Sequence, residues 1–209
     1  MADRTFEYHE SQGAFREAAH WWRSLVGGIE DDQWNRPAVG EWTVRELVAH
    51  GARAFRTVTD YLAMESVDDT WIESAAEYFR IVLAEQNPHV HIAERARQEA
   101  VAETDWIQGT DQRWAAVDAA LSRARGGAHV RLFVGEMRLD QYLATRVVEL
   151  VVHGTDLAAA IGIPSSPPVA ASRVAIDVLL DLSTGDDLAS IARMLTGRPG
   201  SLPFANVLA

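Results

Sequence analysis

The 209-residue chain contains no cysteine, and all 19 of its basic residues are arginine. The absence of cysteine excludes structural disulfides, cysteine nucleophiles and thiolate metal ligands. The absence of lysine excludes Schiff-base catalysis and the lysine of a P-loop. Any sulfur chemistry would therefore have to use a thiol that the chain takes from outside.

Long apolar runs and excess positive charge are missing as well. No apolar stretch approaches the roughly 18 residues of a membrane span, and the start, Met1–Arg4, lacks the basic and apolar segments of a signal peptide. The formal net charge of −11 repels phosphate backbones and anionic lipids. We therefore expect a cytoplasmic protein whose main partner is neither nucleic acid nor a membrane.

Apolar residues recur at steps of three and four through the first part of the chain, which predicts helices. One amphipathic helix is expected over about 15–29. A second begins after Thr43, which can form a capping box with Glu46. A third is expected from Trp71 to about residue 85.

The second half continues the helical pattern. Residues 92–124 predict a helix-rich segment with a break near Gly109. Residues 130–134 are β-prone and fit either a strand or an extended loop. A long helix, capped by Asp140, should run to about residue 161. The remaining residues suggest two short helices and a tail.

These elements predict an all-α protein, organised as a bundle over residues 1–165 with a short helical C-terminal extension over 166–209 packed on it. The helix expected over 140–161 is the most informative one. It is apolar almost all round, yet five polar side chains recur on it at steps of three and four: Tyr142, Arg146, Glu149, His153 and Asp156. Ionisable groups inside a core have to pair, form hydrogen bonds or hold a metal.

Two members of this stripe predict a metal site. Glu149 and His153 lie four residues apart, so their side chains can converge on one point. His50, on the flank of the second helix, is the candidate for a third ligand. Two histidines and one glutamate around a free fourth position describe a catalytic zinc site rather than a structural one.

Other interpretations of the same residues remain open. Glu149 could pair with Arg146 and His153 with Asp156, as a satisfied buried network. His50 could be an ordinary hydrogen-bonded core residue. The other five histidines are expected in surface or packing roles; they are His9, His20, His89, His91 and His129.

Two segments resemble a known family. Residues 35–50 include Gly-Glu-Trp-Thr-Val-Arg-Glu-Leu-Val-Ala-His, and residues 143–158 include Thr-Arg-Val-Val-Glu-Leu-Val-Val-His-Gly-Thr-Asp-Leu-Ala. Both are similar to signatures of the mycothiol-dependent maleylpyruvate isomerase N-terminal domain, within the DinB-like superfamily. The resemblance covers about residues 10–165.

The resemblance implies a DinB-like four-helix bundle with His50, Glu149 and His153 as zinc ligands. It also implies that the metal binds and activates the thiol of mycothiol, the cosubstrate. The resemblance also implies that the isomerases carry a further C-terminal domain that contributes to the active site, and we expect residues 166–209 not to form a complete one. We therefore expect a metal-dependent, mycothiol-dependent thiol transferase or isomerase that acts on a small electrophile.

Two further residues are candidates for a role in that reaction. Arg146 could bind a substrate carboxylate or orient Glu149, and a purely structural salt bridge is the alternative. Tyr142 could line the pocket or donate a proton. A divalent metal other than zinc, and a homodimer, stay open.

Two other functions compete with this one. The first is a non-catalytic metal- or ligand-binding bundle that acts as a sensor or partner module. The second is metal-dependent hydrolysis, which is weaker because Val151 and Val152 precede His153 where metalloproteases carry an inner glutamate.

Overall fold

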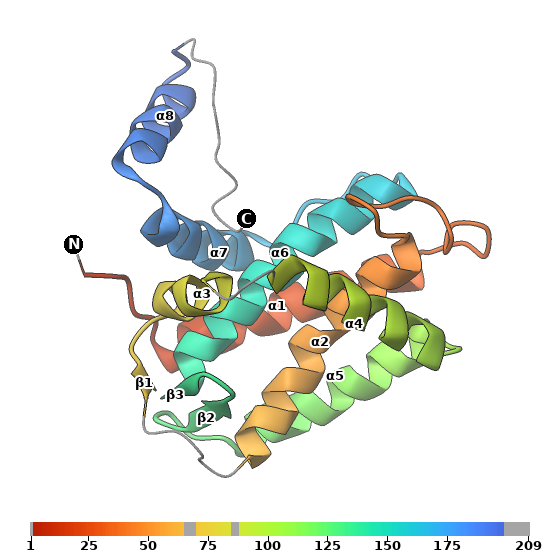
Figure 1. Cartoon of the computed structure of the whole chain (residues 1–209), viewed down its shortest axis with the longest axis horizontal. Helices are drawn as coiled ribbons and strands as arrows, with labels where there is room; N and C mark the ends of the chain where they lie inside the picture. The colour runs from red at the N-terminus through yellow and green to blue at the C-terminus, as the bar shows by residue number, and fades with distance from the viewer. Residues whose placement is uncertain (1, 65–69, 85–87, 199–209) are drawn as a thin grey trace.

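The computed structural model describes residues 2–64, 70–84 and 88–198. Within them the chain forms eight helices and three short strands (Figure 1). In chain order these are α1 (Tyr8–Gly27), α2 (Val44–Ala63), β1 (Trp71–Ile72), α3 (Ala75–Leu83), α4 (Pro88–Ala102), α5 (Trp106–Arg123), β2 (His129–Leu132), β3 (Gly135–Arg138), α6 (Leu139–Ile161), α7 (Val169–Leu182) and α8 (Gly185–Leu195).

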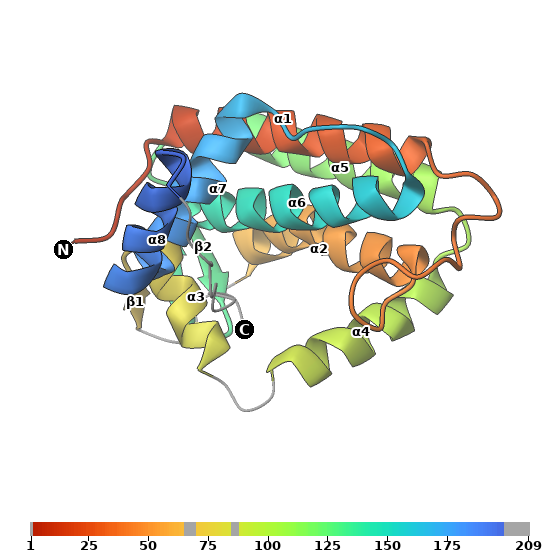
Figure 2. The same ribbon diagram turned by 90° about the horizontal axis from the view of Figure 1, so that it is seen from above.

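Four helices make a closed bundle. α6 packs on α1 and on α2, and α5 packs on the same two helices from the other side. Figure 2 shows these four lying side by side along one direction. Their inward side chains form one apolar core in which Trp22, Phe15, Phe55, Leu47 and Leu143 are fully buried. The expected all-α DinB-like bundle is therefore confirmed.

The helix boundaries next to the candidate site follow from local sequence. Thr43 and Glu46 form the expected capping box at the start of α2: the Thr43 amide donates to Glu46 Oε2 at 2.7 Å, and the Glu46 amide to Thr43 Oγ1 at 3.3 Å. Gly162 ends α6 in the left-handed region, with φ +72°. Both helices that carry candidate ligands thus have defined ends.

The prediction of a helix from Trp71 was wrong for its first residues. Trp71 and Ile72 form strand β1, which pairs in parallel with Glu136 and Met137 of β3. The helix begins only after Ser74, whose side chain accepts from the Glu77 amide. Apolar spacing cannot reveal a strand partner that lies more than 60 residues further along the chain.

The sequence of residues 130–134 fitted either a strand or an extended loop, and in the structure residues 129–132 form strand β2. β2 pairs antiparallel with β3, so that the sheet order is β1-β3-β2. This small sheet closes one end of the bundle beside α2 and α6 (Figure 1).

Two predicted helix boundaries were also wrong. The break expected near Gly109 lies at residues 103–105, where Asp105 caps α5 by accepting from the Gln108 amide, and Gly109 is inside the helix. Asp140 does not cap α6, because the N-cap position is Arg138. The Asp140 carboxylate is buried in the first turn and accepts from the Arg138 guanidinium.

The C-terminal part contains the two short helices that were expected. α7 packs on α6 and α1, whereas α8 projects away from the bundle (Figure 1) and buries only Asp187. Residues 199–209, with the expected tail, lie outside the described part of the chain. The division at residue 165 stays a prediction. None of the described helices is long and apolar enough to cross a bilayer.

Candidate metal centre

The three predicted metal ligands meet between α2 and α6, two helices that pack directly on each other. His50 Nε2 lies 3.2 Å from Glu149 Oε2, and His153 Nε2 lies 3.4 Å from the same oxygen. One ligand atom from each residue falls within 4.8 Å of the others. Residues 99 positions apart in sequence therefore offer their donor atoms to one point.

Two of the three spacings between these atoms fit a tetrahedral cation. Ligands about 2.1 Å from zinc are separated by roughly 3.4 Å at tetrahedral angles. The two nitrogen–oxygen separations, 3.2 and 3.4 Å, match that edge. Two imidazole nitrogens and a carboxylate oxygen are all electron-pair donors, so a proton or a cation has to lie among them.

The second ring nitrogen of each histidine has a different environment. His153 Nδ1 lies 3.3 Å from Asp156 Oδ2, one turn further along α6. A carboxylate in this place fixes the tautomer that leaves Nε2 free to bind a metal. His50 Nδ1 is buried and has no hydrogen-bond partner among the described residues. Asp156 therefore supports His153, while the second ring nitrogen of His50 has no such support.

The pKa values of the two histidines shift in opposite directions. Burial lowers the pKa of His50, and Glu149 only partly opposes this effect. Burial also disfavours a charged His153, but its hydrogen bonds to Asp156 and Glu149 outweigh burial and raise the pKa to about 9. Burial would raise the pKa of Glu149, yet the hydrogen bonds with His153 and His50 hold it well below the usual range. Without a cation, His153 carries the proton that the cluster needs.

The two oxygens of Glu149 face different partners. Oε2 faces both histidines, while Oε1 lies 4.0 Å from Nη2 of Arg146. The guanidinium of Arg146 is buried, and its Nε donates to Thr145 Oγ1 at 3.0 Å. The sequence had left open that Glu149 pairs with Arg146 and His153 with Asp156, and both contacts are present: the first is a long ion pair of 4.0 Å and the second measures 3.3 Å.

Aromatic rings enclose the other side of Arg146. Its guanidinium carbon lies 4.8 Å from the ring centroid of Tyr142 and 5.7 Å from that of Tyr78. Tyr142 is fully buried, which raises the pKa of its hydroxyl. Tyr61 completes the group, with its ring 5.6 Å from that of Tyr142. Sequence reasoning singled out Tyr142 and missed Tyr78 and Tyr61, because they lie on other helices.

Trp42 forms a wall beside the histidines. Its ring centroid lies 4.9 Å from that of His50 and 6.0 Å from that of His153. The loop before α2 holds Trp42 in place, because its amide donates to the Val39 carbonyl and its carbonyl accepts from the Ala38 amide. The indole is partly exposed, so it borders the site without closing it.

The other histidines whose side chains the structure describes lie outside the cluster. His9, His20 and His129 are exposed. His20 packs against Trp114, and His129 pairs with Glu136 at 3.0 Å. The side chains of His89 and His91 lie outside the described residues.

In comparisons with known proteins, the chain matches one protein-family model. The family model described as the mycothiol maleylpyruvate isomerase N-terminal domain matches residues 15–158, which include all three candidate ligands and both signature segments. No curated protein and no solved structure matches the chain.

Proposed function

The chain belongs to the mycothiol maleylpyruvate isomerase N-terminal domain family, and on this premise we propose that it is a metal-dependent thiol transferase or isomerase. In this proposal His50, Glu149 and His153 hold a divalent cation, zinc by preference. A small electrophile is the substrate, and mycothiol is the cosubstrate. The convergence of two imidazole nitrogens on one oxygen of Glu149 carries the proposal.

The donor set and its surroundings support a catalytic rather than a structural metal. Structural zinc sites in proteins are closed by four protein ligands, whereas the described residues provide three. The three side chains are partly exposed, from 12 % for His50 to 24 % for Glu149. This exposure supports access of an exogenous ligand to a fourth position.

The nature of that ligand follows from what the chain lacks. Bound in the fourth position, a thiol would be acidified by the cation, which acts as a Lewis acid and makes thiolate available at neutral pH. The chain has no cysteine of its own. A small-molecule thiol is therefore the nucleophile that this site lacks, and the family description names mycothiol.

The neighbouring side chains have separate roles in this proposal. Asp156 accepts from Nδ1 of His153 and keeps Nε2 directed at the cation. Arg146 holds Oε1 of Glu149, so that Oε2 faces the histidines; it is a positioning residue here, and contact with a substrate carboxylate is the alternative. Tyr142 serves as a wall, because a fully buried hydroxyl with a raised pKa is a poor proton donor.

One observation favours a second candidate function, a non-catalytic metal- or ligand-binding bundle. Among the described residues around the site, Arg146 stays charged and Tyr142 is buried. Tyr78 is buried as well, so the ligands, Asp156 and the partly exposed Tyr61 are the remaining acid–base groups. A site that binds a metal and a thiol without turnover would need nothing more.

Metal content and thiol consumption separate the two functions. Purified protein is loaded with zinc, and consumption of mycothiol is followed with a panel of small electrophiles, beside metal-free protein and His153→Ala. We expect consumption only with the metal-loaded wild type. Bound zinc without thiol consumption would favour the binding module. Hydrolysis without any thiol would contradict both.

The same experiment addresses the finer expectations. Loading with nickel, iron or manganese tests the preference for zinc, since ligand type alone does not select a metal. The cytoplasmic location and a homodimer stay predictions, which fractionation and light scattering would test.

A further inference from the structure

A second cleft lies on another face of α2, away from the metal centre. Its floor and walls come from α2, from the end of α4 and from α5, and it has a volume of about 110 Å³. Ala49, Ala52, Arg53 and Arg56 of α2 line one side at steps of three and four. On this helix His50 points instead at α6. The cleft is therefore separate from the candidate ligands.

The cleft exists because small residues meet where larger ones would fill the gap. Ala49 and Ala52 of α2 line the cleft together with Ala102 at the end of α4 and the ring of Trp106, whose centroid lies 5.2 Å from the guanidinium carbon of Arg113. Ala49, Ala52 and Trp106 are themselves buried. The chain turns between α4 and α5 at residues 103–105, so no helix covers this corner. The result is an apolar floor.

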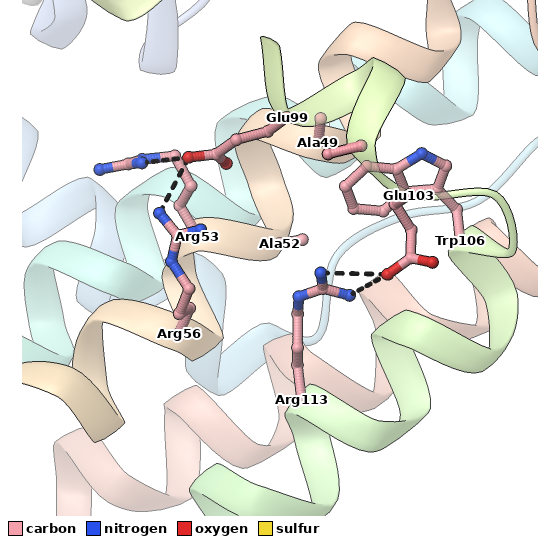
Figure 3. A pocket seen from close by; sticks show the side chains of 9 residues that line it. Ala49, Ala52, Arg53, Arg56, Glu99, Glu103, Trp106 and Arg113 are labelled. Carbon is pink, nitrogen blue, oxygen red and sulfur yellow. Dashed lines mark hydrogen bonds and ion pairs between the residues drawn. The ribbon is translucent and has the colours of Figure 1, made fainter. Parts of the chain in front are cut away.

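Charged groups form the rim above this floor. Arg53 and Arg56 each donate to the same oxygen, Oε1 of Glu99, at 2.8 Å. On the other side both Nη atoms of Arg113 donate to Oε2 of Glu103, at 3.2 and 3.3 Å. Figure 3 shows these two ion-paired groups on opposite sides of Ala52. Two sets of guanidinium donors thus border one apolar floor.

The lining carries an excess of positive charge. Three arginines meet two glutamates, although the whole chain has a formal net charge of −11. Arg56 also faces Asp60, with Nε 3.7 Å from Oδ2, but that carboxylate is mostly exposed and lies outside the cleft. Each guanidinium has five N–H donors, and the two glutamates engage only some of them. The residues that line the cleft therefore carry one more positive than negative charge.

We propose that this cleft binds a small organic monocarboxylate. The planar fork of a guanidinium matches a carboxylate, and the body of the ligand would lie on the alanines and the Trp106 ring. One negative charge balances the lining, whereas a phosphate dianion would be repelled by Glu99 and Glu103. Benzene occupies a closed cavity of about 150 Å³. This cleft holds about 110 Å³ but is open on one side, so an acid of the size of butyrate or benzoate would lie partly inside it and partly in solvent.

Calorimetric titration with sodium benzoate tests the proposal, at constant ionic strength so that salt alone does not loosen the ion pairs. We expect saturable binding of one benzoate per chain. A change in tryptophan fluorescence should accompany it and be reduced in Trp106→Phe. Arg113→Gln should weaken binding about tenfold or more, the loss of one charge-assisted hydrogen bond.

Ala52→Leu fills the cleft and should abolish binding, while Ala116→Leu on the exposed side of α5 should bind as the wild type does. If circular dichroism shows that Ala52→Leu does not fold, the benzoate affinity of Arg113→Gln alone tests the site. Equal or tighter binding of inorganic phosphate would overturn the monocarboxylate class. Binding that disappears when metal is removed, or that survives in both cleft variants, would overturn the site.

Discussion

Gly51 of α2 lies so close to Trp22 of α1 that a β-carbon at this position would sit 2.2 Å from the indole ring. The same relationship recurs between Gly154 of α6 and Trp21, where the β-carbon would again meet the ring at 2.2 Å. Each of these glycines directly follows a candidate histidine ligand. Two adjacent tryptophans of α1 therefore set the positions of the two helices that carry the metal centre.

A larger residue at Gly51 should push α2 away from α1, and a larger residue at Gly154 should push α6 away from α1. Gly154→Ala and Gly51→Ala are each expected to lower the free energy of unfolding by roughly 1–3 kcal/mol, as overpacking of a core does. Gly13→Ala is the matched control, because no atom lies within 4 Å of its added methyl group. It should be neutral or stabilise α1 by about 0.4–1 kcal/mol. Urea unfolding of the three variants measures the difference.

Removal of one ligand should abolish tight metal binding. His153→Ala is expected to weaken zinc affinity by more than roughly 100-fold, since losing only an outer partner of a ligand costs 10–100-fold. Elemental analysis after dialysis and competition with a chromophoric chelator give the affinity. Exposed His9→Ala is the control and should keep the wild-type metal content. Equal metal in wild type and His153→Ala would refute the site.

Bound metal should raise the thermal stability of the chain, because the folded protein alone assembles the three ligands. At a free metal concentration 100 times the Kd, the gain is about 2.7 kcal/mol. For a chain of this size that corresponds to a rise in Tm of roughly 5–10 °C. Differential scanning calorimetry with zinc and with EDTA measures it. A similar rise in His153→Ala would show that the metal acts elsewhere.

The raised pKa of His153, about 9 against an ordinary 6.5, predicts opposite pH effects on the metal-free and metal-loaded protein. The proton on His153 stabilises the metal-free fold fully below pH 6.5, and this contribution is lost as pH rises through 9. A metal has to displace the same proton, so its affinity should rise about tenfold per pH unit over most of this range. Melting curves in EDTA and chelator competition at pH 6.5, 7.5 and 8.5 check both trends. His153→Ala should lose the slope in stability.

Arg146 should act on the metal through Glu149. Arg146→Gln is expected to reduce metal affinity about 10–100-fold, as loss of a partner behind a ligand does. Because Arg146 is buried, we expect the variant to be less stable, so metal affinity is compared at temperatures where circular dichroism shows both proteins folded. Arg146→Lys, which keeps the charge, should restore part of the affinity. An unchanged metal affinity with a changed KM for the electrophile would assign Arg146 to substrate binding instead.

Much of the candidate site was predictable from sequence because its determinants are local. Glu149 and His153 share a face of α6 through helical periodicity, and the cap at Thr43 fixes where α2 begins. Residue types restricted the chemistry further, since a chain without cysteine has nitrogen and oxygen ligands for a metal. The family match over residues 15–158 agrees with these signals.

Other features arose only from long-range contacts. Strand β1 forms because residues 71–72 meet β3, and local spacing had favoured a helix there. Arg146, a candidate salt-bridge partner of Glu149 in the sequence, forms that ion pair at 4.0 Å and is also a buried guanidinium beside two tyrosines of α3 and α6. The cleft beside Ala52 depends on where three helices meet.

The sequence alone determined which side chains could hold a cation and on which helix faces they lie, because composition and helical periodicity are properties of short segments. Only the tertiary structure decided that His50 approaches Glu149 to within 3.2 Å. That distance depends on how closely α2 and α6 pack, and the contacts of Trp21 and Trp22 with two glycines set this packing. Such contacts join residues that are far apart in the chain, so no local pattern encodes them.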